Sequence, residues 1–115
     1  MRTPWGESDN VVQVAPGIQW VTTPGHGGYK LSPEKVKEIP PALVAASFNR
    51  QGYNGWFEED CDWAMVCLTF PEIFEGVEKK GALEAALRTV QYFKSDEAKA
   101  EAQRLYDAIL ARDLH

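Results

Sequence analysis

Four carboxylates and a thiol are concentrated between residues 58 and 62, where the sequence reads EEDCD. Neighbouring carboxylates can share acid–base catalysis, because one stays ionised while the other keeps its proton at a raised pKa. The same oxygens could bind a hard cation, and together with the Cys61 thiolate and His26 they could bind zinc. The motif therefore raises three possibilities, which are an acid–base pair, a metal site and an acidic surface that meets a partner.

His26 is the second group that could do chemistry, and it stands beside three glycines, Gly25, Gly27 and Gly28. A histidine in such a loop could act as a general base or a metal ligand, with backbone N–H groups nearby to hold an anion. The simpler interpretation is a turn histidine that hydrogen-bonds its own loop.

The residue types argue against zinc and against a cysteine nucleophile. Zinc ligands usually occur as spaced pairs, and the chain has no CxxC and no second internal histidine. A helix N-terminus would lower the pKa of Cys61, but the four acidic neighbours would raise it again. We therefore expect no metal and no cofactor.

Helix capping is the structural explanation of the same acids. In a helix, Glu58 and Asp62 share a face while Glu59 and Asp60 point elsewhere, so convergence of all four is not expected. Glu58 or Glu59 would lie in the first helical turn, and Asp60 or Asp62 would bond the glycine loop.

The segment ahead of the acids predicts a small antiparallel sheet. Strands are expected at Val11–Ala15 and Ile18–Thr23, joined by the tight-turn pair Pro16-Gly17, with a third at Tyr29–Leu31. Apolar and polar residues alternate along the first two, as in half-buried strands. The alternating set is Val12, Val14, Ile18, Trp20 and Thr22.

Helices are expected in the remainder. Ser32 and Pro33 favour the start of a short helix that Pro40-Pro41 ends, and Ser95 favours the start of the last one. Residues at helical spacing indicate three apolar faces. They are Trp63, Val66, Cys67 and Phe70, ended by Pro71; then Leu83, Ala86, Leu87, Val90 and Phe93; and finally Ala98, Ala102, Leu105, Ile109 and Leu110. The prediction is one α+β domain over residues 1–115, with the sheet packed against the C-terminal helices.

Composition narrows the class of protein. The chain has 115 residues, 44% of them hydrophobic, which suits one globular domain. It has no apolar run long enough for a membrane span and no signal-peptide pattern, so we expect it in the cytosol of the host cell. Cys61 and Cys67 are spaced too far apart for a disulfide on one helix or one strand, and are expected to be free thiols.

The negative charge is concentrated in one segment. Of the formal net charge of −5, residues 56–80 hold seven acidic and two basic residues. No basic stripe with interleaved aromatics is present, so direct nucleic-acid binding is not expected. A local negative field instead suits a basic surface on another protein.

Five motifs carry a resemblance. In order they are TPWG, APGI, TPGHGGYKLS, GWFEEDCDWA and TFPEIF, within residues 3–74. They resemble a family of small proteobacterial, phage and plasmid proteins, a domain of unknown function. The chain departs from that pattern at Phe57, where tyrosine is expected, and in extra residues around Ala45–Asn54. The resemblance implies a mobile-element setting and no particular activity.

Two functions follow as hypotheses. The first is a non-enzymatic protein-binding protein of a phage or mobile element, inhibiting a host defence complex of CRISPR or restriction type through an acidic face. Its binding residues would be Glu58, Glu59, Asp60, Asp62, His26 and Trp56, since exposed tryptophans often anchor binding surfaces. The alternative is a small hydrolase or metal-dependent enzyme in which His26 meets the carboxylates of Glu58–Asp62. It requires His26 within about 4 Å of a carboxylate in a concave pocket.

Overall fold

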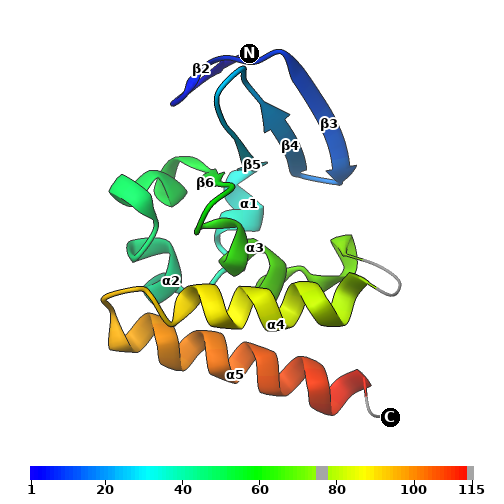
Figure 1. Cartoon of the computed structure of the whole chain (residues 1–115), viewed down its shortest axis with the longest axis vertical. Coiled ribbons are helices and arrows are strands. Elements are labelled where there is room, and N and C mark those ends of the chain that lie inside the picture. Colours follow the sequence, from blue (N-terminus) through cyan, green and yellow to red (C-terminus); the bar gives the residue numbers. More distant parts are fainter. Residues whose placement is uncertain (75–77, 114–115) are drawn as a thin grey trace.

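An antiparallel sheet forms one end of the molecule and a layer of helices the other (Figure 1). The computed structural model describes residues 1–74 and 78–113. The α+β architecture predicted from the sequence is confirmed, with the N-terminal sheet packed against the C-terminal helices. In the part of the chain that the structure describes, no helix is both long and apolar enough to cross a membrane.

The main sheet has four strands in the order β3-β4-β5-β6, each antiparallel to its neighbour. They are β3 (Asn10–Ala15), β4 (Ile18–Thr22), β5 (Gly27–Leu31) and β6 (Trp56–Glu58). The predicted hairpin is confirmed, and Gly17 takes a positive φ of 77° in its turn, a conformation that glycine adopts without strain. Ahead of it, β1 (Arg2–Thr3) and β2 (Gly6–Glu7) form a separate two-stranded ribbon.

The fourth strand places part of the acidic motif in the sheet. Glu58 pairs with Gly28, Phe57 with Tyr29 and Trp56 with Lys30. Glu58 is therefore the last residue of a strand, and the expectation that Glu58 and Asp62 share one helix face is wrong. The turn at residues 59–62 separates β6 from the next helix.

Strand β3 is not half-buried as predicted. Every residue from Asn10 to Val14 is exposed, and Val12 keeps 44% of its surface accessible. The other three strands instead contribute residues to the core. These are Ile18, Leu31 and Phe57, each at most 1% exposed. Alternation in sequence indicated a strand correctly, but could not indicate whether anything packs on it.

Short helices connect the sheet to the helical layer. They are α1 (Pro33–Val36), α2 (Pro41–Ala45), the 3-10 segment η1 (Phe48–Asn54), α3 (Trp63–Thr69) and the 3-10 turn η2 (Pro71–Ile73). The Ser32 hydroxyl accepts the Lys35 N–H, as predicted for a capping residue. The sequence predicts that Pro40-Pro41 ends the first helix, but α1 already ends at Val36, and Pro41 instead begins α2, a second short helix that the sequence did not indicate.

Helix α3 is the centre of the core. Its five successive residues from Ala64 to Leu68 are all at most 1% exposed, so the helix is buried on every side. Two longer antiparallel helices, α4 (Glu78–Val90) and α5 (Asp96–Asp113), lie beneath it (Figure 1). Ser95 caps α5 by accepting the Ala98 N–H, as predicted, whereas Leu110 is exposed and does not join the buried face.

Candidate functional site

One hollow is lined by four of the chemistry-bearing residues that the sequence indicated, His26, Glu58, Asp60 and Cys61. It has a volume of about 390 Å³ and is lined by Trp5, His26, Phe48, Glu58, Asp60 and Cys61. We call it the site hollow. Its walls come from the β1–β2 turn, the β4–β5 loop, the start of η1 and the end of β6 with the turn that follows. Segments up to 56 residues apart in the sequence thus meet here.

His26 lies at the tip of the β4–β5 loop with its side chain exposed. The Thr23 hydroxyl holds the loop, donating to the His26 carbonyl and accepting the His26 N–H, both at 3.1 Å. Within residues 1–74 and 78–113, no ring nitrogen of His26 lies within 4.0 Å of a carboxylate oxygen. The hollow shared with Glu58 is present, but the close pair that the enzyme hypothesis requires is not.

The glycines after His26 allow close packing rather than an anion cradle. A Cβ on Gly28 would lie 2.5 Å from the Trp5 ring and 2.6 Å from the Phe57 carbonyl oxygen. On Gly27 it would meet Glu59 Oε2 at 3.1 Å, and the Glu59 N–H donates to the Gly27 carbonyl. The loop therefore joins the acidic turn through a backbone bond, not through the side chains of Asp60 or Asp62 as predicted.

The TPWG motif fixes Trp5 as a wall of the site hollow. The Thr3 hydroxyl donates to the Gly6 carbonyl at 2.6 Å and accepts the Trp5 N–H at 3.0 Å, closing the turn. The Trp5 ring meets the Trp56 ring edge-on at 5.5 Å between centroids, and Lys30 Nζ lies 4.8 Å from the Trp56 ring. Trp56 thus supports the site from behind Trp5 and is only partly accessible.

Glu58 caps the acidic turn. Its carboxylate accepts three backbone N–H groups, from Asp60 at 2.8 Å, from Cys61, and from Asp62 at 2.8 Å. The capping role expected of Glu58 or Glu59 is confirmed for Glu58, which acts from the end of a strand rather than from a first helical turn. Most of the acceptor capacity of this carboxylate is used inside the turn.

Asp62 lies beneath the surface. It is 1% exposed, and its Oδ2 accepts the Phe48 N–H at 2.9 Å, which ties the start of η1 to the start of α3. Burial raises the pKa of its carboxyl to about 7; backbone hydrogen bonds at Phe48 and Glu58 act the other way, and the Glu58 charge adds to the rise. Asp62 therefore cannot form part of an exposed acidic face, which is a correction to the predicted binding set.

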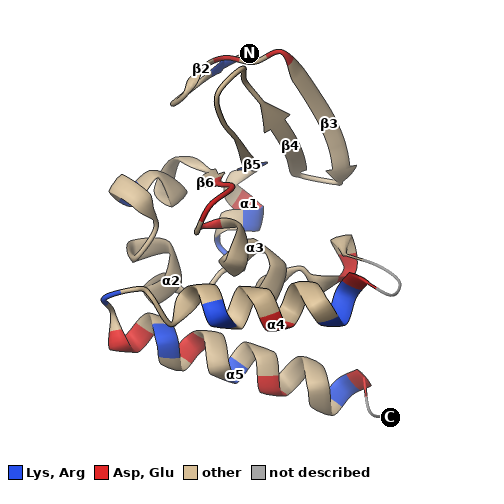
Figure 2. Ribbon diagram, viewed as in Figure 1, with Lys and Arg blue, Asp and Glu red and all other residues tan. Residues whose placement is uncertain are grey.

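The two acids left at the surface are Glu59 and Asp60, which we call the acidic rim. Figure 2 shows the red of this segment beside β6, whereas α4 and α5 carry both signs along their length. The rim borders the site hollow through Asp60.

Cys61 is an exposed thiol in an environment that disfavours the thiolate. Partial burial raises its pKa, and the charges of Glu58, Asp62 and Asp60 raise it further. Cys67 is fully buried in α3, and neither cysteine is bridged, as predicted. Within the described residues, no three His, Cys, Asp or Glu side chains are grouped so that they could hold a metal ion.

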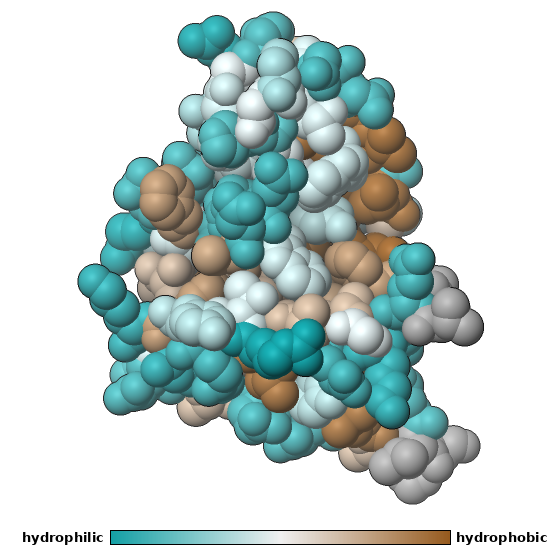
Figure 3. Space-filling view, viewed as in Figure 1, coloured by the Kyte–Doolittle hydropathy of each residue, from teal (hydrophilic) through white to brown (hydrophobic). Residues whose placement is uncertain are grey.

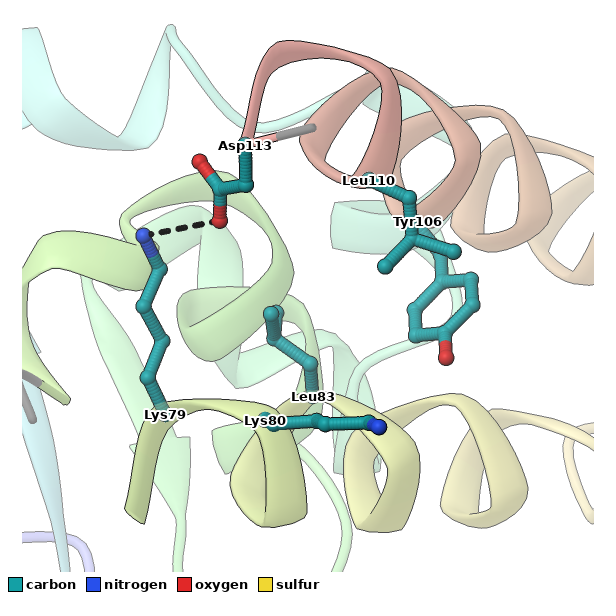
Figure 4. Close-up of a pocket in the computed structure, with 6 residues that line it drawn as sticks. All are labelled: Lys79, Lys80, Leu83, Tyr106, Leu110 and Asp113. Carbon is teal, nitrogen blue, oxygen red and sulfur yellow. Dashed lines mark ion pairs between the residues drawn. The ribbon is translucent and has the colours of Figure 1, made fainter. Parts of the chain in front are cut away.

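A second hollow, of about 270 Å³, lies between α4 and α5, and none of the site residues predicted from the sequence lines it (Figure 4). Lys79 Nζ pairs with Asp113 Oδ2 at 3.1 Å across its mouth, and Lys80 and Tyr106 face it from opposite helices. Its charge is thus partly neutralised within the chain, whereas the acidic rim makes no ion pair among the described residues.

Comparison with known proteins gives a family and no activity. Residues 1–111 match the model of a family described as a domain of unknown function (DUF7007). No curated protein and no solved structure matches the chain.

Proposed function

The chain belongs to the DUF7007 family, and we propose that it is a non-enzymatic protein-binding protein of a phage or another mobile element. The observation that carries the proposal is the juxtaposition of two exposed acids, which form no ion pair within residues 1–74 and 78–113, with a hollow lined by Trp5 and Phe48. Phe48 is 58% exposed, so its ring is accessible to a partner.

The chemistry of the site indicates a basic partner. A carboxylate beside aromatic rings suits arginine or lysine, whose charge meets the acid while the ring face takes the cation or its apolar stem. The segment of residues 56–80, which includes these two acids, has a formal net charge of −5, which would attract such a surface at long range. We therefore expect the partner to present exposed arginines or lysines on a folded surface.

A nucleic-acid-reading complex is the specific partner we propose. Such complexes carry the basic surfaces that an acidic rim would meet, and the motif order of the chain resembles proteins of phages and plasmids. Inhibition of a host defence complex of CRISPR or restriction type, in the host cytosol, would combine these two points. The chain would then select its target by the basic surface of that protein complex, and would not itself recognise nucleic-acid bases.

A comparative capture experiment tests the proposal. The double variant Glu59→Lys, Asp60→Lys reverses the acidic rim, and Glu97→Lys, Asp107→Lys on α5 changes the net charge equally at a distance. Proteins that bind the wild type and the α5 variant but not the rim variant are the expected result. Their binding should weaken as salt rises, because exposed charges are screened over about 10 Å at 0.1 M. Equal capture by all three chains would overturn the proposal.

A small hydrolase is the second candidate, because His26, Glu58 and Cys61 do line one hollow. It would need His26 to move toward a carboxylate when substrate binds. A panel of generic ester and phosphoester substrates tests it, with His26→Ala as the loss-of-function variant. Hydrolysis by the wild type that His26→Ala abolishes would favour this candidate over the binding protein.

A further inference from the structure

Strand β3 is an open sheet edge with apolar side chains on it. Within the described part of the chain it is the last strand on its side of the four-stranded sheet and pairs only with β4. Val11, Val12 and Val14 are 38%, 44% and 40% exposed. Figure 3 shows the corresponding brown surface along β3. An edge strand of this kind leaves backbone N–H and C=O groups ready to pair with another strand.

Charge and proline, two usual protections of an edge strand, are missing from this edge, whereas the opposite edge is short and ends in an acid. Residues 10–15 read NVVQVA, without lysine, other charge or proline, and the strand is uniformly tan in Figure 2. At the other edge, β6 has only three residues and ends in Glu58. The one irregularity in β3 is a bulge between Gln13 and Ala15, where the Gln13 amide donates to the Ala15 carbonyl. The regular part of the open edge is therefore Asn10–Gln13.

We propose that this edge pairs with the β3 edge of a second copy of the chain, making one continuous sheet across a two-fold axis. A second copy of the chain can approach this edge although its net charge is −5, because the strand itself carries no charge and so adds no local repulsion. In an antiparallel pair, Asp9 of one copy lies beside the far end of the partner strand. The two Asp9 carboxylates are then roughly 20 Å apart, since each residue advances the strand by about 3.3 Å.

Symmetry restricts the register. When a two-fold axis runs through the sheet plane at right angles, paired residues face the same side, so the pair must be centred on one residue. Centring on Val12 lies within the regular part of the edge and places Val12 directly opposite its own copy. Such β-branched cross-strand pairs stabilise sheets. The site hollow includes Glu58 of β6, which is the opposite edge strand of the sheet. Pairing through β3 would therefore leave the site hollow of both copies exposed.

The test is a charge-swap experiment on purified protein. Analytical ultracentrifugation of the wild type from about 5 μM to 500 μM is expected to show a monomer–dimer equilibrium, since one short strand pair buries less than a standard interface. Val12→Lys and Val12→Glu each place like charges opposite one another, and each should raise the dissociation constant at least tenfold. An equimolar mixture of the two should recover the dimer.

Tyr92→Lys is the matched control, because Tyr92 is 88% exposed and lies in the turn between α4 and α5. It should leave the dimer unchanged, and circular dichroism with thermal unfolding verifies that all variants keep the fold. A wild type that stays monomeric up to 500 μM would overturn the proposal. So would a dimer that Val12→Lys leaves intact, or a mixture that fails to associate while both variants are folded.

Discussion

Replacing Asp62 by asparagine is expected to remove a large pH dependence from the free energy of unfolding. Burial raises the pKa of the Asp62 carboxyl to about 7 in the folded chain, from an ordinary value of 3.8. Between those values the folded chain holds a proton that the unfolded chain has released, so the stability of the fold decreases as pH rises. Above pH 7 the buried carboxylate is ionised and the whole penalty is present.

The magnitude follows from the separation between the pH and the folded pKa. Each unit below pH 7 is worth about 1.4 kcal/mol, so moving the wild type from pH 8 to pH 5 should add up to about 3 kcal/mol through this group. For a domain of this size each kcal/mol shifts Tm by about 4 °C, which gives roughly 10 °C. The Asp62→Asn side chain keeps an oxygen for the Phe48 N–H, now bonded at 2.9 Å, so the packing should survive.

Urea unfolding followed by tryptophan fluorescence at pH 5, 6, 7 and 8 measures the effect. Asp62→Asn should be more stable than the wild type at pH 5 and exceed it by a further amount of about 3 kcal/mol (about 1.4 kcal/mol per pH unit up to pH 7) at pH 8, because the difference between the two chains isolates the buried carboxyl. Asp60→Asn removes an exposed acid two residues away and should follow the wild-type profile. A difference between the wild type and Asp62→Asn that stays constant from pH 5 to pH 8 would refute the reasoning.

Three further outcomes are expected from the site's contacts. Glu58→Ala leaves three backbone N–H groups without their acceptor and should lower the free energy of unfolding by about 1 to 2 kcal/mol, whereas exposed Glu59→Ala should change it little. Gly28→Ala forces a Cβ to within 2.5 Å of the Trp5 ring and should cost about 2 kcal/mol in chemical unfolding. Gly25→Ala, with nothing within 4 Å, should stay within about 0.5 kcal/mol of the wild type, and equal losses at the two glycines would contradict the packing argument. Native protein should react with a maleimide at Cys61 alone, slowly at pH 7 and faster at pH 9, since its pKa is raised; the buried thiol should react only in denaturant.

Features set by neighbouring residues were predictable from the sequence. The Pro16-Gly17 pair indicated the hairpin because its chemistry suits a tight turn whatever surrounds it. Ser32 and Ser95 likewise indicated two helix starts, since a capping hydroxyl acts on an N–H only three residues away. Long apolar stripes indicated α4 and α5 for the same local reason.

Features set by distant residues were not predictable. Strand β6 has only three residues, and its partners, Gly28 to Lys30, are nearly thirty positions earlier, so no local period marks it. Asp62 looks like its acidic neighbours in sequence, and only the Phe48 backbone, fourteen residues away, shows why it is buried. The open face of Val12 depends on which strands the helices cover, which strand alternation does not encode.

The position of β6 also constrains the order in which the fold can assemble. Strands β3, β4 and β5 follow one another through short turns, so their meander can form from local contacts alone. Joining β6 requires closing the loop from Leu31 to Trp56, an entropic cost of roughly 3 kcal/mol for about 25 residues. This cost is offset by the burial of Phe57, which is completely buried in the core. During synthesis the meander therefore has two open edges until residue 58 has left the ribosome, and the arrival of Phe57 couples closure of the sheet to formation of the core.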